Sequence, residues 1–215
     1  QKLDRLHRFV RLWRRLGWSL SECDKVLSAF ASGAPAISSE TLVRIDHLKS
    51  FATRLRLGVL DTLALWRDID TREPNSLYRK LFYDPAVFRS QDQSFRLRPD
   101  GLELEHPDGV LLDHAASLQA VFRLNADSLA LMVSRTDGKL TLANLSLIHR
   151  HATFARQLRL SAQDLLTAIE LTGLLPFDID RMGDAERLAD IAPGGAASGY
   201  PWSQLGYLLR HRFTP

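Results

Sequence analysis

"LGWSLSECDKVL", residues 16–27, contains the end of one helix and the start of another. Gly17 is typical of the position just beyond the last turn of a helix. Ser19 is a typical N-cap, whose side chain accepts a hydrogen bond from a free backbone N–H of the next helix. Glu22, three residues later, can complete a reciprocal capping box with Ser19. The stretch therefore predicts two consecutive helices joined by a tight turn.

The same pattern occurs three more times, in LRLGVLDTLALW (55–66), FRLNADSLALMV (122–133) and LRLSAQDLLTAI (158–169). Each copy follows an amphipathic helical pattern and places an apolar residue directly before a cap residue. The expected caps are Ser19, Gly58, Asn125 and Ser161. Successive copies start 39, 67 and 36 residues apart, which corresponds to a helix-turn-helix repeat with an insertion in the middle interval. We therefore predict an all-α fold, an irregular helical bundle or a solenoid of helix-turn-helix repeats.

Residues 1–215 are expected to form one helical domain that is a fragment of a longer chain, because the sequence opens inside an amphipathic helix without Met. A short helix is expected over residues 76–82. Residues 173–200, with their glycine, alanine, serine and proline residues, are expected to be a loop-rich segment before a final helix that begins near Trp202.

The insertion, residues 88–112, is expected to be a loop that contains a small β-hairpin. In FRLRPDGLELEHPDGV (95–110), apolar and charged residues alternate around a Pro-Asp-Gly turn, which is the period of a strand. The apolar residues that would face one another across the hairpin are Phe95, Leu97, Leu102 and Leu104. Two strands alone are marginally stable in water, so the hairpin would have to lean on the helices.

The helix before Gly17 separates its residues into an apolar face and a face of five arginines. The simplest interpretation is a helix that buries one stripe and leaves its arginines in solvent. The alternative is a surface for nucleic acid or another acidic partner. The formal net charge is only +3, with 25 acidic residues spread along the chain, whereas nucleic-acid domains usually concentrate their positive charge. We therefore expect no nucleic-acid partner.

No constellation of catalytic or metal-binding residues stands out, so we expect no enzyme activity, no metal and no cofactor. The single Cys23 cannot form an internal disulfide. His149 and His151 are two residues apart and therefore lie on different faces of a helix, which disfavours a shared metal ion. They are candidates for pH sensing, because histidines titrate near neutrality and Arg150 lies between them. A hydrolase would need a cleft of converging polar groups, for which the sequence gives no sign.

Four blocks, in this order, carry a resemblance to a known family. They are LDRLHRFVRLWRRLGWSLSECDKVL (3–27), WRDIDTREPNSLYRKLFYDP (66–85), LQAVFRLNADSLALM (118–132) and LANLSLIHRHATFARQLRLSAQDLLTAI (142–169). Together they resemble the helical region of the A subunits of bacterial toxin complexes, a family that includes insecticidal toxins and virulence-plasmid A proteins. The helix with arginines and a tryptophan, followed by Gly-Trp-Ser, and the Leu-Tyr-x-x-Leu-Phe block are the most specific parts.

This resemblance implies a structural role. In that family, the resemblance implies, the A subunit forms a large bell-shaped homo-oligomer. Its helical domains form a shell around a central translocation channel, receptor-binding domains lie on the outside, and a pH change triggers membrane insertion. B and C subunits deliver the cytotoxic component through it. The chain would then be a shell segment of a secreted or cell-surface protein, without direct membrane insertion of its own. The alternative is a helical-repeat binding module whose arginine-rich face engages nucleic acid or an acidic protein.

Overall fold

The computed structural model describes residues 2–31, 37–73, 75–84, 92–197 and 199–210 of the chain. These ranges contain eleven α-helices and three short 3-10 helices. The α-helices are α1 (Lys2–Leu16), α2 (Leu20–Phe30), α3 (Ser39–Leu55), α4 (Val59–Leu63), α5 (Leu77–Phe82), α6 (Ala115–Phe122), α7 (Ala126–Val133), α8 (Leu142–Leu158), α9 (Ala162–Thr172), α10 (Gly183–Ala197) and α11 (Trp202–Arg210). The 3-10 helices are η1 (Gln93–Phe95), η2 (Leu111–His114) and η3 (Ile179–Arg181). The predicted all-α class is confirmed.

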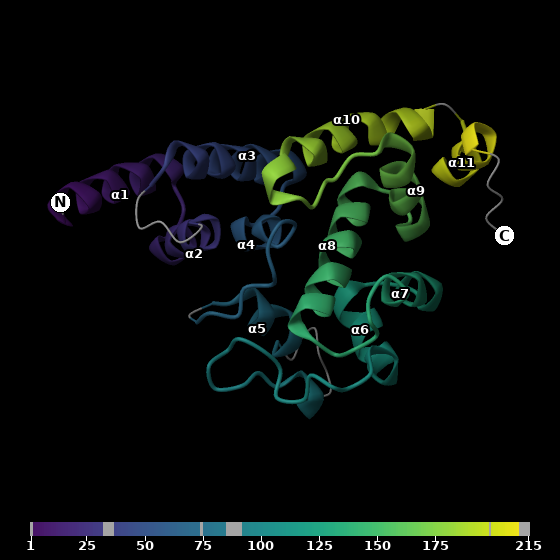
Figure 1. Cartoon of the computed structure of the whole chain (residues 1–215), viewed down its shortest axis with the longest axis horizontal. Coiled ribbons are helices and arrows are strands. Elements are labelled where there is room, and N and C mark those ends of the chain that lie inside the picture. Colours follow the sequence, from purple (N-terminus) through teal and green to yellow (C-terminus); the bar gives the residue numbers. More distant parts are fainter. Residues whose placement is uncertain (1, 32–36, 74, 85–91, 198, 211–215) are drawn as a thin grey trace.

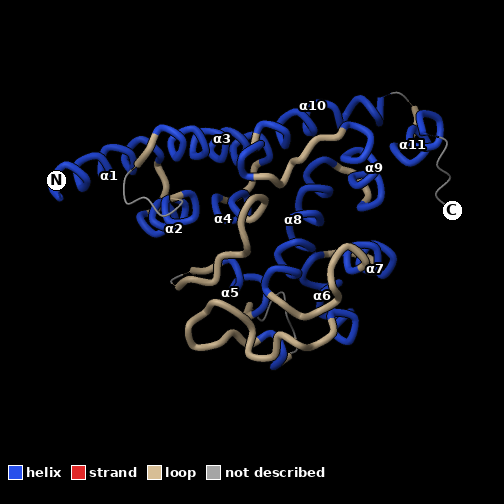
Figure 2. The backbone as a smooth tube through the Cα atoms, in the orientation of Figure 1, coloured by secondary structure: helices blue, strands red, loops and turns tan. Residues whose placement is uncertain are grey.

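The helices form an elongated array (Figure 1). Helices α1, α3 and α10 follow one another along one side, and α8 runs away from this row toward α5 and α6. The contacts group α2, α3 and α4 together, and α6 to α9 together, while α10 and α11 pack on α9. Most of the loop lies beside α5 and α6, where the insertion is found (Figure 2). This arrangement of neighbouring helical hairpins agrees with the repeat in the sequence.

The turn between helices is built in the same way in three of the repeats. After α3, α6 and α8, an arginine adopts the left-handed conformation, with φ between 54° and 57°. These residues are Arg56, Arg123 and Arg159. The next residue, a leucine in each case, donates its N–H to a carbonyl five residues back, which is the Schellman motif. Gly17, also left-handed, precedes Trp18 in the first repeat. The turns therefore reverse the chain at equivalent positions.

One continuous core joins the two halves of the array. The Phe51 ring of α3 lies 5.7 Å from Trp66 and 5.9 Å from Phe154 of α8, centroid to centroid. The Ser146 hydroxyl on α8 accepts the N–H of Ile69 at 2.9 Å. Because these contacts connect residues far apart in the sequence, burial of these side chains, each contributing about 1.5–3 kcal/mol, depends on both halves.

The expected β-hairpin does not form as two strands within the described residues. One isolated bridge joins Leu97 to Leu104, and the backbone pairs that flank it keep the expected register, with Arg98 N donating to Glu103 O at 2.9 Å. The expected apolar face is broken, however, because Leu102 is 74% exposed while Phe95 lies in η1, fully buried. The prediction of two strands was wrong. Alternation of apolar and charged residues here does not produce one buried and one exposed face of a sheet.

Other contacts fix the insertion. The Phe95 ring stacks on Phe82 of α5 at 4.9 Å, and Tyr78 donates its hydroxyl hydrogen to the carbonyl of Phe95 at 2.8 Å. Glu103 turns toward α8, where its carboxylate accepts the N–H of Leu142 at 2.8 Å. Leu142 is the first residue of α8, so Glu103 satisfies a free N–H group at the positive end of that helix. The insertion is thus held by aromatic packing and by a helix cap.

The expectation of a loop-rich segment over 173–200 needs a correction as well. Helix α10 occupies Gly183–Ala197, and Pro193 lies inside it. Leu188, Ala189 and Ala192 on this helix are buried. Burial of this apolar face stabilises the helix, although its small residues are typical of a loop. Residues 76–82 do form the short helix α5 with Ser76 as its N-cap, and α11 begins at Trp202.

Helix α1 has the predicted apolar and arginine faces, but only part of its apolar face is buried. Leu12 and Leu16 pack against the core, whereas Leu3 is 82% and Leu6 58% exposed. The helix extends away from the rest of the array at the N-terminal end (Figure 1). The outer part of the apolar stripe therefore has no covering element among the described residues.

Candidate functional site

The four expected caps all lie at N-caps of helices, namely α2, α4, α7 and α9. Ser19 and Glu22 form the reciprocal capping box. Asn125 and Ser161 each accept the N–H of the residue three positions later, at 2.8 Å and 3.0 Å. Gly58 begins α4 without a side-chain bond. These residues start helices and do not converge on a site.

His149 is buried on the face of α8 that packs against α6. Its ring lies 6.0 Å from that of Phe122, and its Nε2 is 3.4 Å from the Thr153 hydroxyl. Its Nδ1 is buried without a hydrogen-bond partner in the described structure. Burial, together with the nearby charges of Arg156 and Arg150, lowers the pKa of His149 to about 4. His149 is therefore neutral at neutral pH.

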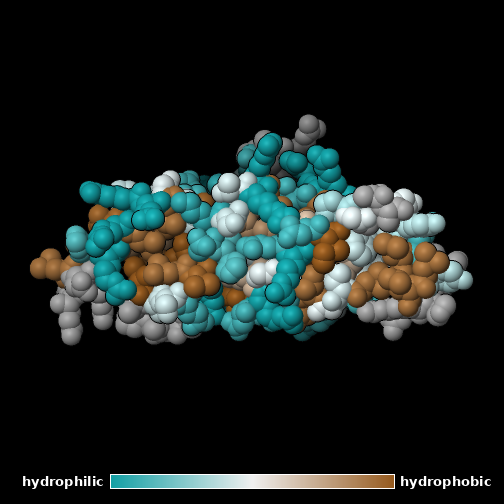
Figure 3. Space-filling model, turned by 90° about the horizontal axis from the view of Figure 1, so that it is seen from above, coloured by the Kyte–Doolittle hydropathy of each residue, from teal (hydrophilic) through white to brown (hydrophobic). Residues whose placement is uncertain are grey.

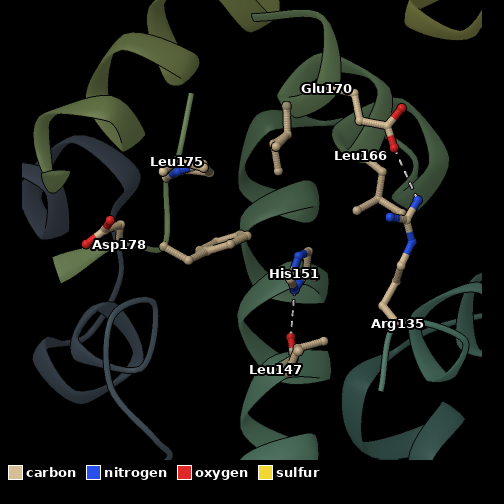
Figure 4. Close-up of a pocket in the computed structure, with 10 residues that line it drawn as sticks. Arg135, Leu147, His151, Leu166, Glu170, Leu175 and Asp178 are labelled. Carbon is tan, nitrogen blue, oxygen red and sulfur yellow. Dashed lines mark hydrogen bonds and ion pairs between the residues drawn. The ribbon is translucent and has the colours of Figure 1, made fainter. Parts of the chain in front are cut away.

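His151 lies on a different face of α8 and lines an open cavity of about 520 Å³ (Figure 4). Its Nδ1 is 2.8 Å from the carbonyl oxygen of Leu147, and its ring centroid is 4.5 Å from that of Phe177. Burial, with the charges of Arg150 and Arg135, lowers the pKa of His151 to about 4, although the bond to Leu147 opposes this shift. The structure thus separates the two histidines, and protonation of either would come well below neutrality.

Three elements and the end of a fourth build the cavity: α8, α9, the segment 175–178 and the chain just after α7. Its lining residues are Arg135, Leu147, His151, Leu166, Ile169, Glu170, Leu175, Pro176, Phe177 and Asp178. At the rim, Arg135 and Glu170 form an ion pair at 3.3 Å. In Figure 4 the His151 ring lies between Leu175 and Asp178 on one side and Leu166 and Arg135 on the other. The wall is mostly apolar, and His151 supplies the polar group inside it.

No motif in the sequence predicts this cavity. A signal was present, because the connection after α9 contains Leu174, Leu175 and Phe177, which are unusually apolar for a surface loop. The prediction of a loop here agrees with the structure of residues 175–178. It does not predict that this loop forms one wall of a cavity. The lining comes from residues up to 43 positions apart, Arg135 to Asp178, so spacing alone could not bring them together.

Metal and thiol chemistry find little support in the described residues. No group of three histidine, cysteine, aspartate or glutamate residues in these ranges is arranged to hold a metal ion. Cys23 is buried, and burial raises the pKa of its thiol to about 11, so the reactive thiolate is scarce at neutral pH. None of the helices in the described ranges is long and apolar enough to span a bilayer.

The arginine face of α1 is partly used inside the protein. Arg8 donates to the carbonyl of Ile37 at 2.9 Å. Arg11, Arg14 and Arg15 are exposed. Three exposed arginines on one helix make a small positive surface, and Lys49 of α3, which donates to the carbonyl of Arg15 at 3.2 Å, lies beside it.

The architecture defines an all-α array of helical hairpins, and comparisons with known proteins agree with it. The chain matches no model of a known protein family and no curated protein. Among solved structures it is similar to TcdA4 of Morganella morganii, determined by electron cryo-microscopy, with a TM-score of 0.66 and 16% sequence identity. The match covers 96% of this chain and 9% of TcdA4, so the chain spans a small part of that protein's length. The likeness shows that this chain has the fold of a stretch of TcdA4.

Proposed function

We propose that this chain is a segment of the helical shell of a toxin-complex A subunit, with a structural and non-catalytic role. The observation that carries the proposal is the fold likeness to TcdA4, a toxin-complex A subunit, over 96% of the chain. The four sequence blocks that resemble the same family also support it. In this proposal the full-length polypeptide is secreted and homo-oligomeric, and it works with B and C subunits.

Apolar side chains exposed at the two ends of the array fit a segment that is packed between further helices. Leu3 and Leu6 are exposed on α1, and Leu208 and Leu209 are 55% and 70% exposed on α11. Figure 3 shows hydrophobic surface at both the α1 end and the α11 end. Helical repeats bury such faces against the next repeat. We infer that neighbouring parts of a longer chain cover them.

Hydrogen exchange can test this proposal. The amides of α1 and α11 should exchange at least about tenfold more slowly in the full-length polypeptide than in the isolated 215-residue chain, because covered helices open less often. The amides of α8, which is packed inside the array, serve as the internal control and should differ little. Equal exchange of α1 and α11 in the two proteins would contradict the proposed packing.

The alternative, a binding module for nucleic acid or an acidic protein, is favoured by the exposed Arg11, Arg14 and Arg15 of α1. Binding through these charges would weaken steeply as salt is added, because counterions are released on contact with phosphates. A gel-shift titration with duplex DNA and with RNA at low salt tests it. No shift at protein concentrations of about 10 µM, where even non-specific binding is usually measurable, would remove this alternative.

A further inference from the structure

The cavity beside His151 has the size and the lining of a small-molecule site. Its volume of about 520 Å³ lies within the range of roughly 300–1,000 Å³ that such sites occupy. Leu147, Leu166, Ile169 and Phe177 give it apolar walls. We propose that this cavity binds a neutral aromatic ring that carries one hydrogen-bond donor, that is, a phenol, either free or as the side chain of a tyrosine.

His151 is the group that would recognise the donor. A carbonyl oxygen only accepts hydrogen bonds, so the 2.8 Å contact with Leu147 O means that Nδ1 carries the hydrogen. In the neutral ring, Nε2 is then an acceptor. No donor of the described chain is bonded to Nε2, although the ring lies among apolar walls. Nε2 is not among the buried atoms that lack a partner, so it is open to the cavity. A ligand that displaced water from Nε2 without offering a donor would leave an unpaired acceptor, so a ligand hydroxyl is favoured here.

The remaining groups favour a neutral and aromatic ligand. The Phe177 ring, 4.5 Å from the imidazole and tilted by 57°, supplies an aromatic wall against which a second ring can pack. Arg135 and Glu170 neutralise each other at the rim, so neither is free to attract an ion. The Asp178 carboxylate points away from His151 in Figure 4, and it accepts the N–H of Asp180 at 2.9 Å. Among the described residues, a charged ligand beside the imidazole would therefore find no unpaired countercharge, because the Asp178 carboxylate is turned away.

Two probes with the same body test the role of the hydroxyl. We would titrate the chain with 4-ethylphenol and with 4-ethylanisole, in which the hydroxyl is methylated, and follow the ring proton signals of His151 by NMR. The Kd of 4-ethylphenol should be on the order of 1 mM, as expected for so small a ligand. The anisole should bind about three- to tenfold more weakly, since it cannot donate a hydrogen bond. No binding of the phenol, or equal binding of the two probes, would overturn the proposal.

A third probe, N-acetyltyrosinamide, distinguishes the two sources of the phenol. Affinity similar to that of 4-ethylphenol would mean that the cavity takes a tyrosine side chain of a protein. Affinity about tenfold or more lower, with 4-ethylphenol still preferred over the anisole, would mean that it takes a free phenol. Both outcomes support the recognition of a phenol.

The variant His151→Phe tests the assigned acceptor. It keeps a ring beside Phe177 but removes Nε2, so the preference for phenol over anisole, followed through the Phe177 signals, should disappear. His106→Phe is the matched control, because His106 is exposed on the insertion, and it should retain the preference. A preference that persists in His151→Phe would refute the assignment. Circular dichroism checks that each variant is folded. If His151→Phe does not fold, the comparison of 4-ethylphenol with 4-ethylanisole on the unaltered chain decides the proposal.

Discussion

Replacing His149 by phenylalanine should make the stability of this chain less sensitive to acid. The imidazole is buried between α8 and α6, and Nδ1, one of the atoms that protonation would charge, has no hydrogen-bond partner in the described structure. A proton on the folded ring would place a charge in an apolar environment near Arg156 and Arg150. The unfolded chain, by contrast, takes up this proton freely. Acid therefore favours the unfolded state.

The magnitude follows from the two pKa values. The pKa of His149 falls from 6.5 in the unfolded chain to about 4 in the folded one. Between these values the unfolded state binds more protons, so stability is lost as the pH falls from about 6.5 toward about 4. Going from about pH 7 to about pH 5 should lower the free energy of unfolding by about 2 kcal/mol through His149 alone. His151, whose pKa is lowered in the same direction, adds a further loss that the variant leaves in place.

Urea unfolding followed by far-UV circular dichroism at the two pH values measures this effect. The quantity compared is the loss of unfolding free energy between about pH 7 and about pH 5. A packing cost of the larger ring affects both pH values and cancels. His149→Phe should lose about 2 kcal/mol less than the unaltered chain, and the exposed His106→Phe should behave as the unaltered chain does. Losses that agree within about 0.5 kcal/mol in His149→Phe and the unaltered chain would refute the reasoning.

Three further predictions concern the free energy of unfolding at neutral pH, measured by the same method. Arg159→Gly should stabilise the chain by about 0.5–1 kcal/mol, because Arg159 has the left-handed φ of 57°, which favours glycine. The control Arg187→Gly, inside α10, should destabilise the chain by about 1 kcal/mol. Changes in unfolding free energy of the same sign in both variants would contradict the account of the turns. Glu103→Gln should cost about 1 kcal/mol by weakening the cap on the first N–H of α8, and no change would mean that the cap is dispensable. Lys25→Met should cost about 3 kcal/mol, because Asp70, 2.7 Å away and 8% exposed, would keep a buried charge without its main partner; a loss below about 1 kcal/mol would show that Arg72 or water replaces the lysine.

The helical repeat was readable because its signals are local. Ser19 and Ser161 bond N–H groups only three residues away, so the cap and its partner lie together in the printed sequence. The sequence contains one further local signal of the repeat. The arginine and leucine that precede Gly58, Asn125 and Ser161 form the same turn each time, with a left-handed arginine that sequence preference assigns to glycine.

The alternation of apolar and charged residues in the insertion predicts the observed pairing register. It does not predict that the two strands fail to form. The pairing of Leu97 with Leu104 follows from the turn between them, which is local. The exposure of Leu102 and the turning of Glu103 toward α8 depend on elements about 40 residues away, and no pattern within the insertion encodes them. In α10, likewise, burial of Leu188 and Ala192 against the array outweighs the preference of proline and glycine for loops.

By itself, then, the sequence determined the helical class, the starts of the helices that follow the four repeat caps, and the blocks that resemble a family. Tertiary structure alone decided which apolar faces stay exposed on α1 and α11, and that His149 is enclosed while His151 faces a cavity with Phe177. The physical reason is the range of the interactions. Caps and turns are made between residues a few positions apart, whereas burial and the pKa shifts it causes depend on which distant helices come together.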